Sequence, residues 1–267
     1  MPFSFSQLSL YRSCPRQYEF ANIKKLPRGI SAGESFGSSV HNTLSKWGKL
    51  EMGVGSRALD DSNQLTLFSS DESDSKPPTP DAQILSDLWH QSFIVEGYAS
   101  KEDADAARVR GESIMEKYFE WWSTCEREVV AIEKGFSIPI TNNQSPITIT
   151  GRFDRIERTD SGIIVIDYKT SKTRTQQEVD TDLQLSIYAL AVEETFGEPC
   201  SKLMLLFLRD DGITETYTKR SAVQLEEAKK QIALFAEGIE SKEFAPTPGE
   251  SVCKHCSYRG VCDASVV

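Results

Sequence analysis

Hydrophobic residues recur every three or four positions in several parts of the chain, a spacing that places them on one side of an α-helix. Between residues 36 and 50, for example, Phe36, Val40, Leu44 and Trp47 share such a side. Together with helix-breaking proline and glycine residues, the spacing predicts helices over residues 4–22 with an interruption at Cys14-Pro15, 36–50, 83–124 with a break near Gly97, 181–196 ended by Gly197, and 222–241.

Runs rich in branched and aromatic residues between turn signals predict strands. Three such runs follow one another at residues 129–140, 147–157 and 163–169. Two more, at residues 203–209 and 213–218, are predicted to form a hairpin around Asp210-Asp211-Gly212. The order of elements indicates a mixed α/β fold, in which residues 83–125 form a helical insertion between the first helices and the sheet.

Residues 51–82 interrupt this pattern. The stretch 59–81 is rich in Ser, Asp and Pro and has no sustained periodicity, so we expect a disordered acidic surface loop. It contributes to a formal net charge of −10, from 40 acidic and 30 basic residues. This charge argues against a protein that coats nucleic acid by bulk electrostatic attraction, but it leaves room for a local basic groove.

The chain shows no sign of membrane insertion or export. No apolar stretch approaches the roughly 20 residues of a membrane span, and the first 20 residues contain Arg12 and Arg16 and no long apolar run. The sequence therefore predicts a cytoplasmic protein with reduced thiols.

The apolar strand at residues 163–169 ends in an acid and a base. Side chains alternate along a strand, so Asp167 and Lys169 face the same way. If the turn before this strand has two or four residues, paired positions sum to 321 and Asp154 lies opposite Asp167, whereas a three-residue turn would change this register. If Ile140 also pairs with Ile147, Glu133 lies opposite Asp154.

Three acids would then form a row across neighbouring strands, beside a lysine. Like charges in such a row repel one another, and a divalent cation such as Mg²⁺ or Mn²⁺ relieves the repulsion. A metal-activated water and a lysine that stabilises developing negative charge are the groups that phosphodiester hydrolysis needs. The alternative interpretation is that Asp154 and Asp167 only end their strands, with Lys169 in a surface ion pair.

The motifs around these residues resemble the RecB-type branch of the PD-(D/E)XK nuclease superfamily. The resemblance implies a restriction-endonuclease-like mixed sheet flanked by helices, in a single nuclease domain over residues 1–267. It implies that the metal ligands are His41, Asp154 and Asp167, that Lys169 is catalytic, and that Gln184 and Tyr188 line the site. Glu133 matches the acid often found on the preceding strand. The matching motifs are GSSVHNTL with His41, GRFDRIE with Asp154, VIDYKT with Asp167 and Lys169, and QLSIYAL with Gln184 and Tyr188.

Three cysteines near the end of the chain form a C-x2-C-x5-C motif. In a reduced compartment, Cys253, Cys256 and Cys262 are typical of a metal site, which needs a fourth ligand. The segment YRSCPRQYEF resembles the N-terminal cysteine segment of iron–sulfur RecB-type nucleases, including AddB-like and CRISPR-associated proteins, and this resemblance implies Cys14 as that ligand in a [4Fe–4S] cluster. Zinc stays open as an alternative.

The remaining candidate ligands and thiols receive simpler interpretations. His255 lies between two of these cysteines and could compete as a ligand, but we interpret it as a bystander. Cys125 and Cys200 are predicted to be ordinary thiols in a helix end and a loop.

The sequence thus predicts a metal-dependent DNA nuclease, of exonuclease type, in repair, recombination or defence. The expected partners are single-stranded DNA or duplex ends, and possible phosphate contacts are Lys24, Lys25, Arg28, Lys172 and Arg174. The chain has no G-x4-G-K-[ST] motif, so ATP-driven unwinding would need a helicase on another chain. Two alternatives remain: a non-catalytic DNA-binding or scaffold subunit of a helicase–nuclease complex, and a zinc-stabilised structural protein, which leaves the acids unexplained.

Overall fold

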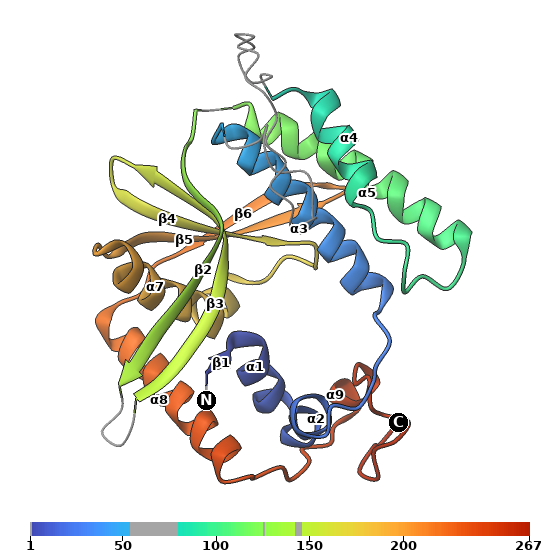
Figure 1. The fold of residues 1–267 in the computed structure, drawn as a ribbon, viewed down its shortest axis with the longest axis vertical. Coiled ribbons are helices and arrows are strands. Elements are labelled where there is room, and N and C mark those ends of the chain that lie inside the picture. Colours follow the sequence, from blue (N-terminus) through green and yellow to red (C-terminus); the bar gives the residue numbers. More distant parts are fainter. Residues whose placement is uncertain (1, 54–79, 125, 142–145) are drawn as a thin grey trace, which may run out of the picture.

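The computed structural model describes residues 2–53, 80–124, 126–141 and 146–267 and shows a mixed α/β fold around one mixed sheet (Figure 1). In the described residues the sheet has six strands. Five of them pair in the order β1-β3-β4-β5-β6, and β2 pairs with β3 outside this path. The β1–β3 and β4–β5 pairs are parallel and the other pairs are antiparallel. The strands are β1 (Phe3–Ser4), β2 (Glu128–Thr141), β3 (Pro146–Thr159), β4 (Gly162–Lys169), β5 (Cys200–Arg209) and β6 (Gly212–Thr218).

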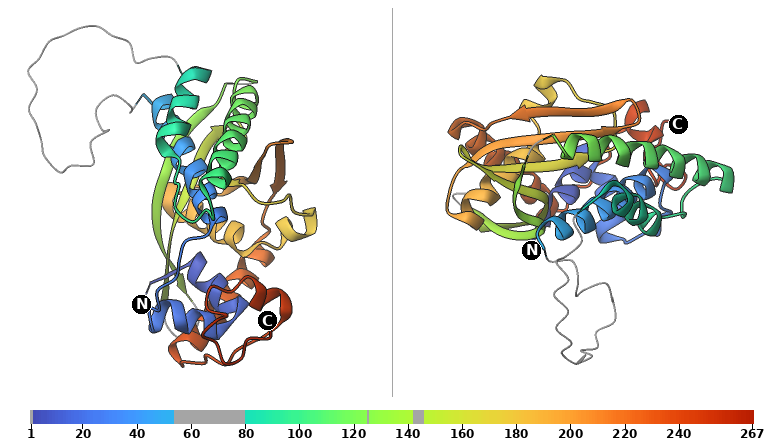
Figure 2. Two further views of the ribbon diagram at one scale, coloured as in Figure 1. Left: turned by 90° about the vertical axis from the view of Figure 1, so that its right-hand side faces the viewer. Right: turned by 90° about the horizontal axis from the view of Figure 1, so that it is seen from above.

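Helices cover both faces of the sheet (Figures 1 and 2). One face packs against α1, α7 and α8, and the other against α3, α4 and α5. Within the described residues, no helix combines the length and the apolar composition needed to cross a bilayer. The helical segments are α1 (Phe5–Ser13), α2 (Pro15–Tyr18), the π-helical η1 (Glu19–Ile23), α3 (Ala32–Glu51), α4 (Ala82–Ser92), α5 (Lys101–Trp122), α6 (Gln176–Asp180), α7 (Leu183–Phe196), α8 (Ala222–Glu240) and α9 (Glu250–Lys254).

The helices follow the hydrophobic pattern, with differences that capping explains. Helix α3 begins four residues before the predicted start because Ser31 and Glu34 form a capping box. The helix predicted over residues 181–196 is α7, which begins two residues later because the Asp182 side chain caps it by accepting from the Leu185 amide. The predicted break at Cys14-Pro15 is confirmed. Most of the predicted acidic loop falls on residues 54–79, outside the described ranges.

The helices predicted as an insertion complete the core on one face of the sheet. Trp89 of α4 and Ile114 of α5 are fully buried. They belong to one hydrophobic cluster with Trp47 of α3, Ile166 of β4 and Leu206 of β5. The segment 83–125 therefore contributes to the packing around the strands that carry the candidate site.

Gly111 of α5 allows α4 and α5 to approach closely. A Cβ atom at this position would lie 1.8 Å from Cζ2 of Trp89, whose indole Nε1 donates to the Arg108 carbonyl at 3.0 Å. We expect Gly111→Ala to destabilise the fold by about 1–3 kcal/mol through overpacking, measured by thermal unfolding. Gly33→Ala in α3 is the control, because nothing lies within 4 Å of its Cβ position, and it should change stability by less than about 1 kcal/mol. Equal unfolding temperatures would contradict the packing argument.

Candidate active site

The strand register brings the predicted acids to one place. The β3–β4 ladder pairs Arg155 with Ile166, in the predicted register, and ends directly before Asp154 and Asp167. The β2–β3 ladder also has the predicted register, since Ile140 pairs with Ile147. The prediction of the register is confirmed on both sides of β3.

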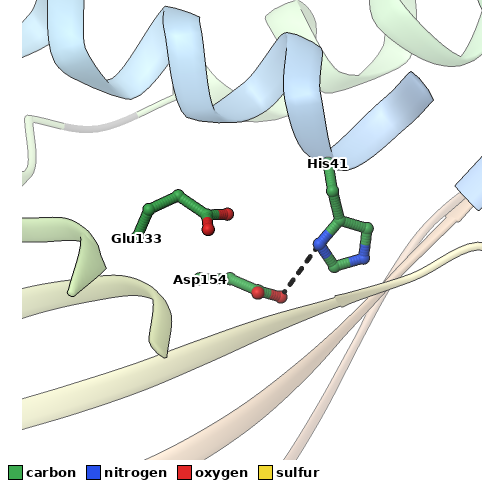
Figure 3. A group of neighbouring side chains, drawn as sticks. All are labelled: His41, Glu133 and Asp154. Atoms are coloured by element: carbon green, nitrogen blue, oxygen red, sulfur yellow. Dashed lines mark ion pairs between the residues drawn. The ribbon is translucent and has the colours of Figure 1, made fainter. Parts of the chain in front are cut away.

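Glu133 is directed into the site by an unusual backbone conformation. Its φ of 51° lies in the left-handed region, which is uncommon for a residue other than glycine. The residues before and after it pair with Arg155 and Phe153, which flank Asp154. The Glu133 carboxylate points toward His41 and Asp154 (Figure 3) and forms a 3.0 Å ion pair with Arg152.

His41, Glu133 and Asp154 form a candidate metal centre. They come from α3, β2 and β3, and each offers one ligand atom within 4.8 Å of the others. In the described part of the chain this is the only set of three or more His, Cys, Asp or Glu side chains at that spacing. Carboxylate oxygen and imidazole nitrogen are suitable ligands for Mg²⁺ or Mn²⁺.

The main chain of Tyr168 fixes two of these side chains. Its amide donates to Asp154 Oδ2 at 2.9 Å, and its carbonyl lies 3.0 Å from His41 Nε2. A carbonyl only accepts, so Nε2 carries the hydrogen and Nδ1, 3.4 Å from Asp154 Oδ2, is the nitrogen left to face a cation. Sequence reasoning missed this role because it belongs to backbone groups, which any residue type supplies.

The charge of His41 is set by competing effects. Burial would lower the pKa of His41, but the hydrogen bond and charge of Asp154, together with the charge of Asp167, outweigh it and raise that pKa. Without a cation the imidazole therefore holds a proton more readily than a free histidine does. A bound cation would replace that proton, because a metal ligand must be the neutral imidazole.

Asp167 and Lys169 lie beside this centre in a hydrogen-bonded group with Gln184 and Tyr188. Lys169 Nζ is 2.5 Å from Asp167 Oδ2 and donates to Gln184 Oε1 at 3.0 Å. The Gln184 amide nitrogen donates to Asp167 Oδ1 at 3.1 Å and to the Tyr188 hydroxyl at 2.9 Å. The lysine ammonium is thus held in place by two side chains.

Asp167 is the least exposed of the acids, at 2%. Burial raises the pKa of Asp167, and the neighbouring Lys169 opposes this rise. Its carboxylate faces Lys169 and is not part of the group formed by His41, Glu133 and Asp154. The ligand role that the resemblance implies for Asp167 stays a prediction.

The basic residues expected to contact phosphates are partly engaged in ion pairs. The basic partner of each pair is exposed to solvent, which weakens the pair, so a phosphate group can compete for it. Lys25 and Lys172 are exposed. The ion pairs are Lys24–Glu19 at 3.1 Å, Arg28–Glu34 at 2.7 Å and Arg174–Asp182 at 2.5 Å.

The two ends of the described chain lie side by side, with α1 and α2 next to α9 (Figures 1 and 2). The Tyr11 hydroxyl donates to the Glu243 carbonyl at 2.9 Å, and Thr247 donates to the Ser13 carbonyl at 3.0 Å. This contact brings Cys14 to the C-terminal cysteines. One pocket is lined by Cys14, Cys253, Cys256 and Cys262.

The four sulfur atoms surround this pocket without forming a close group. Among the described residues, no three cysteine sulfurs fall within 4.8 Å of one another. Burial raises the pKa of the Cys256 thiol, and the charges of the other three cysteines add to that rise. His255 Nδ1 lies 2.8 Å from the Ser251 carbonyl. Cys200, predicted in a loop, is instead the first residue of β5, and Cys125 lies outside the described ranges.

A family model supports the interpretation of the motifs. A family model for the PD-(D/E)XK nuclease superfamily matches residues 2–263. The gene 69 protein of Mycobacterium phage D29 is 26% identical over 276 residues, which cover 97% of this chain and 95% of that protein. Among solved structures, an exonuclease candidate from Eubacterium rectale is similar with a TM-score of 0.47 and 10% identity, over 98% of this chain and 89% of that one. The family match includes every residue of the candidate centre.

Proposed function

Because the chain belongs to the PD-(D/E)XK nuclease superfamily, whose members are metal-dependent nucleases, we propose that it hydrolyses phosphodiester bonds in DNA. The observation that carries the proposal is the grouping of His41, Glu133 and Asp154 within 4.8 Å of one another, beside a lysine. An exonuclease-type activity in repair, recombination or defence fits this site. Because the chain has no nucleotide-binding G-x4-G-K-[ST] motif, a helicase partner would supply any unwinding.

The residues of the site have separable tasks. His41 and Asp154 would hold a divalent ion, with further oxygen ligands from Glu133 or Asp167. When bound, such an ion would supply activation of a water molecule and neutralisation of charge on the phosphate. Lys169 places a positive charge beside the acids, where it stabilises the negative charge that develops during hydrolysis. Gln184 orients Lys169, whose ammonium donates a 3.0 Å hydrogen bond to Gln184 Oε1. The Gln184 amide nitrogen also donates to Asp167.

A DNA cleavage assay tests this proposal. It uses anaerobically purified protein and labelled single-stranded or duplex DNA, with Mg²⁺, Mn²⁺ or a chelator. We expect cleavage with either metal and none with chelator. Asp154→Asn should lower the rate by at least about 100-fold in Mg²⁺, because a carboxylate ligand is lost, and excess Mn²⁺ should restore part of it. Asp160→Asn, at an exposed turn position of the same hairpin, is the matched control and should cut normally. DNA binding without cleavage by the wild type would instead favour a non-catalytic scaffold subunit.

We further propose that Cys14, Cys253, Cys256 and Cys262 hold a [4Fe–4S] cluster. The four line a single pocket formed by both ends of the chain, which supplies the four thiolates that a cubane cluster needs. Around one zinc ion, tetrahedral sulfurs at about 2.3 Å from the metal would lie only about 3.8 Å apart, closer than any three cysteine sulfurs of the described residues. In a cubane each thiolate binds a different iron, so its sulfurs lie further apart than those around one zinc ion, and analysis of iron, sulfide and zinc distinguishes the two sites.

A further inference from the structure

Helix α3 and strand β3 are joined by a second contact besides the one between His41 and Asp154. Ten residues after His41, about 15 Å along the helix, Glu51 forms a two-pronged ion pair with Arg155. The distances are 2.5 Å from Arg155 Nη1 to Glu51 Oε2 and 3.0 Å from Arg155 Nη2 to Glu51 Oε1. Trp122 of α5 also donates to Glu51 Oε1, at 2.5 Å.

This ion pair is buried, so water cannot replace either partner if α3 moves away from β3. The Arg155 side chain is 0% exposed and that of Glu51 is 8% exposed. A planar guanidinium that binds both oxygens of a carboxylate fixes orientation as well as distance. Since Arg155 directly follows Asp154 in β3, the pair fixes the end of α3 relative to one of the candidate metal ligands.

The same end of α3 also contacts the strand that carries Glu133. A Cβ atom on Gly48 would lie only 2.4 Å from Cδ1 of Ile132, so the helix backbone rests closely on β2. Ile132 directly precedes Glu133. The last turn of α3 is therefore placed against the chain neighbours of both acids, whereas its middle turn supplies the histidine.

From this geometry we infer that the Glu51–Arg155 ion pair is a positioning device that aligns His41 with Asp154 and Glu133 and so sets the affinity of the site for a divalent cation. The inference rests on the proposed function, because it assumes that these three residues bind the ion. Neither Glu51 nor Arg155 touches the ion or the substrate. Their effect is transmitted through the helix and the strand.

The chain contains a matched control for the loss of buried charge. Glu157 accepts from Arg155 Nε at 2.7 Å and is 5% exposed. It lies on β3, as Arg155 does, so its contact with the arginine does not involve α3. Glu51→Gln and Glu157→Gln each remove one carboxylate from the same buried arginine, but only the first weakens the link between the helix and the strand.

The decisive measurement is Mn²⁺ binding to the full-length protein without DNA, by calorimetry or by electron paramagnetic resonance. We expect Glu51→Gln to raise the Kd for Mn²⁺ about tenfold and Glu157→Gln to change it less than twofold, although both lower the unfolding temperature. An unchanged Kd in folded Glu51→Gln, or an equal rise in both variants, would show that the pair is merely structural.

Two further variants keep the test decisive. If Glu51→Gln does not fold, Trp122→Phe takes its place. It removes the indole donor to Glu51 and keeps an aromatic ring beside Trp47 and Phe119. It should raise the Kd two- to threefold, and no change there would overturn the inference. His41→Ala should weaken Mn²⁺ binding more than either glutamate variant, and a Kd insensitive to it would place the metal elsewhere and overturn the proposed metal centre too.

Cleavage separates the two proposals. Glu51→Gln should need about tenfold more Mn²⁺ for half-maximal cleavage but should reach the wild-type rate at saturation. If the wild type binds Mn²⁺ through His41 but cuts no DNA, the proposed function fails while the binding data still decide the positioning role.

Discussion

Replacement of Lys169 by alanine is expected to reduce DNA cleavage by at least about 100-fold while leaving DNA binding largely intact. The ammonium is held 2.5 Å from Asp167 Oδ2 and 3.0 Å from Gln184 Oε1, so it is already placed where it can stabilise developing charge. Binding should persist because one lysine is only one of many phosphate contacts. Single-turnover cleavage and DNA affinity, measured on the same preparation, check both expectations.

Lys172→Ala is the matched control, since Lys172 lies three residues further on and is exposed. This variant should weaken DNA binding slightly and leave the rate at which bound DNA is cleaved unchanged. Wild-type cleavage by Lys169→Ala would show that the lysine has no catalytic role.

Lys169→Ala should also reveal how the pKa of the buried Asp167 depends on Lys169. Burial raises the pKa of Asp167, and Lys169 opposes the rise. Without the lysine, that pKa should rise further, so ionising Asp167 in the folded protein becomes more costly. The deficit in unfolding free energy of Lys169→Ala should therefore be small in acid, where Asp167 is protonated, and should grow as the pH rises through the carboxyl range. Thermal unfolding of the wild type and of Lys169→Ala, measured at several pH values across the carboxyl range, gives this difference.

The sequence predicts the strand register around Asp154 and Asp167 well because local rules determine it. Turn length and the alternation of strand side chains place Asp154 and Asp167 at the same end of the β3–β4 pair, and the observed register agrees. Hydrophobic spacing predicts the buried side of α3 correctly. Elements of two to five residues, such as β1, α6 and α9, are too short to produce a periodic signal.

Other features of the site depend on tertiary contacts and could not be read from the chain. The left-handed conformation of Glu133 directs its carboxylate toward His41, and nothing in the residue type indicates it. The contacts from the Tyr168 main chain are equally invisible in a sequence. The buried pair of Glu51 and Arg155 joins positions 104 apart, which appear in the sequence only as ordinary charged residues.

Loss of one of the cysteines proposed to hold a cluster is expected to have the largest effect on stability. The candidate ligands lie near both ends of the chain, so a cluster would close a very long loop and restrict the unfolded state, by on the order of 4 kcal/mol if it acts as a long-loop disulfide does. Cys256→Ser should therefore give a colourless, aggregation-prone protein with a lower unfolding temperature. The soluble fraction should keep some cleavage, because no cysteine belongs to the group of His41, Glu133 and Asp154.

Cys200→Ser is the matched control for this variant. Burial raises the pKa of the Cys200 thiol to about 11, and Cys200 begins β5 and does not line the pocket of the four cysteines. The variant should keep the brown colour and the iron content of the wild type. Anaerobic wild type should contain roughly four iron and four sulfide per chain, and stoichiometric zinc without iron or sulfide would replace the cluster with a zinc site. Hydrogen bonds from Tyr11 and Thr247 also join the two chain ends, so Cys256→Ser should loosen these ends without separating them fully.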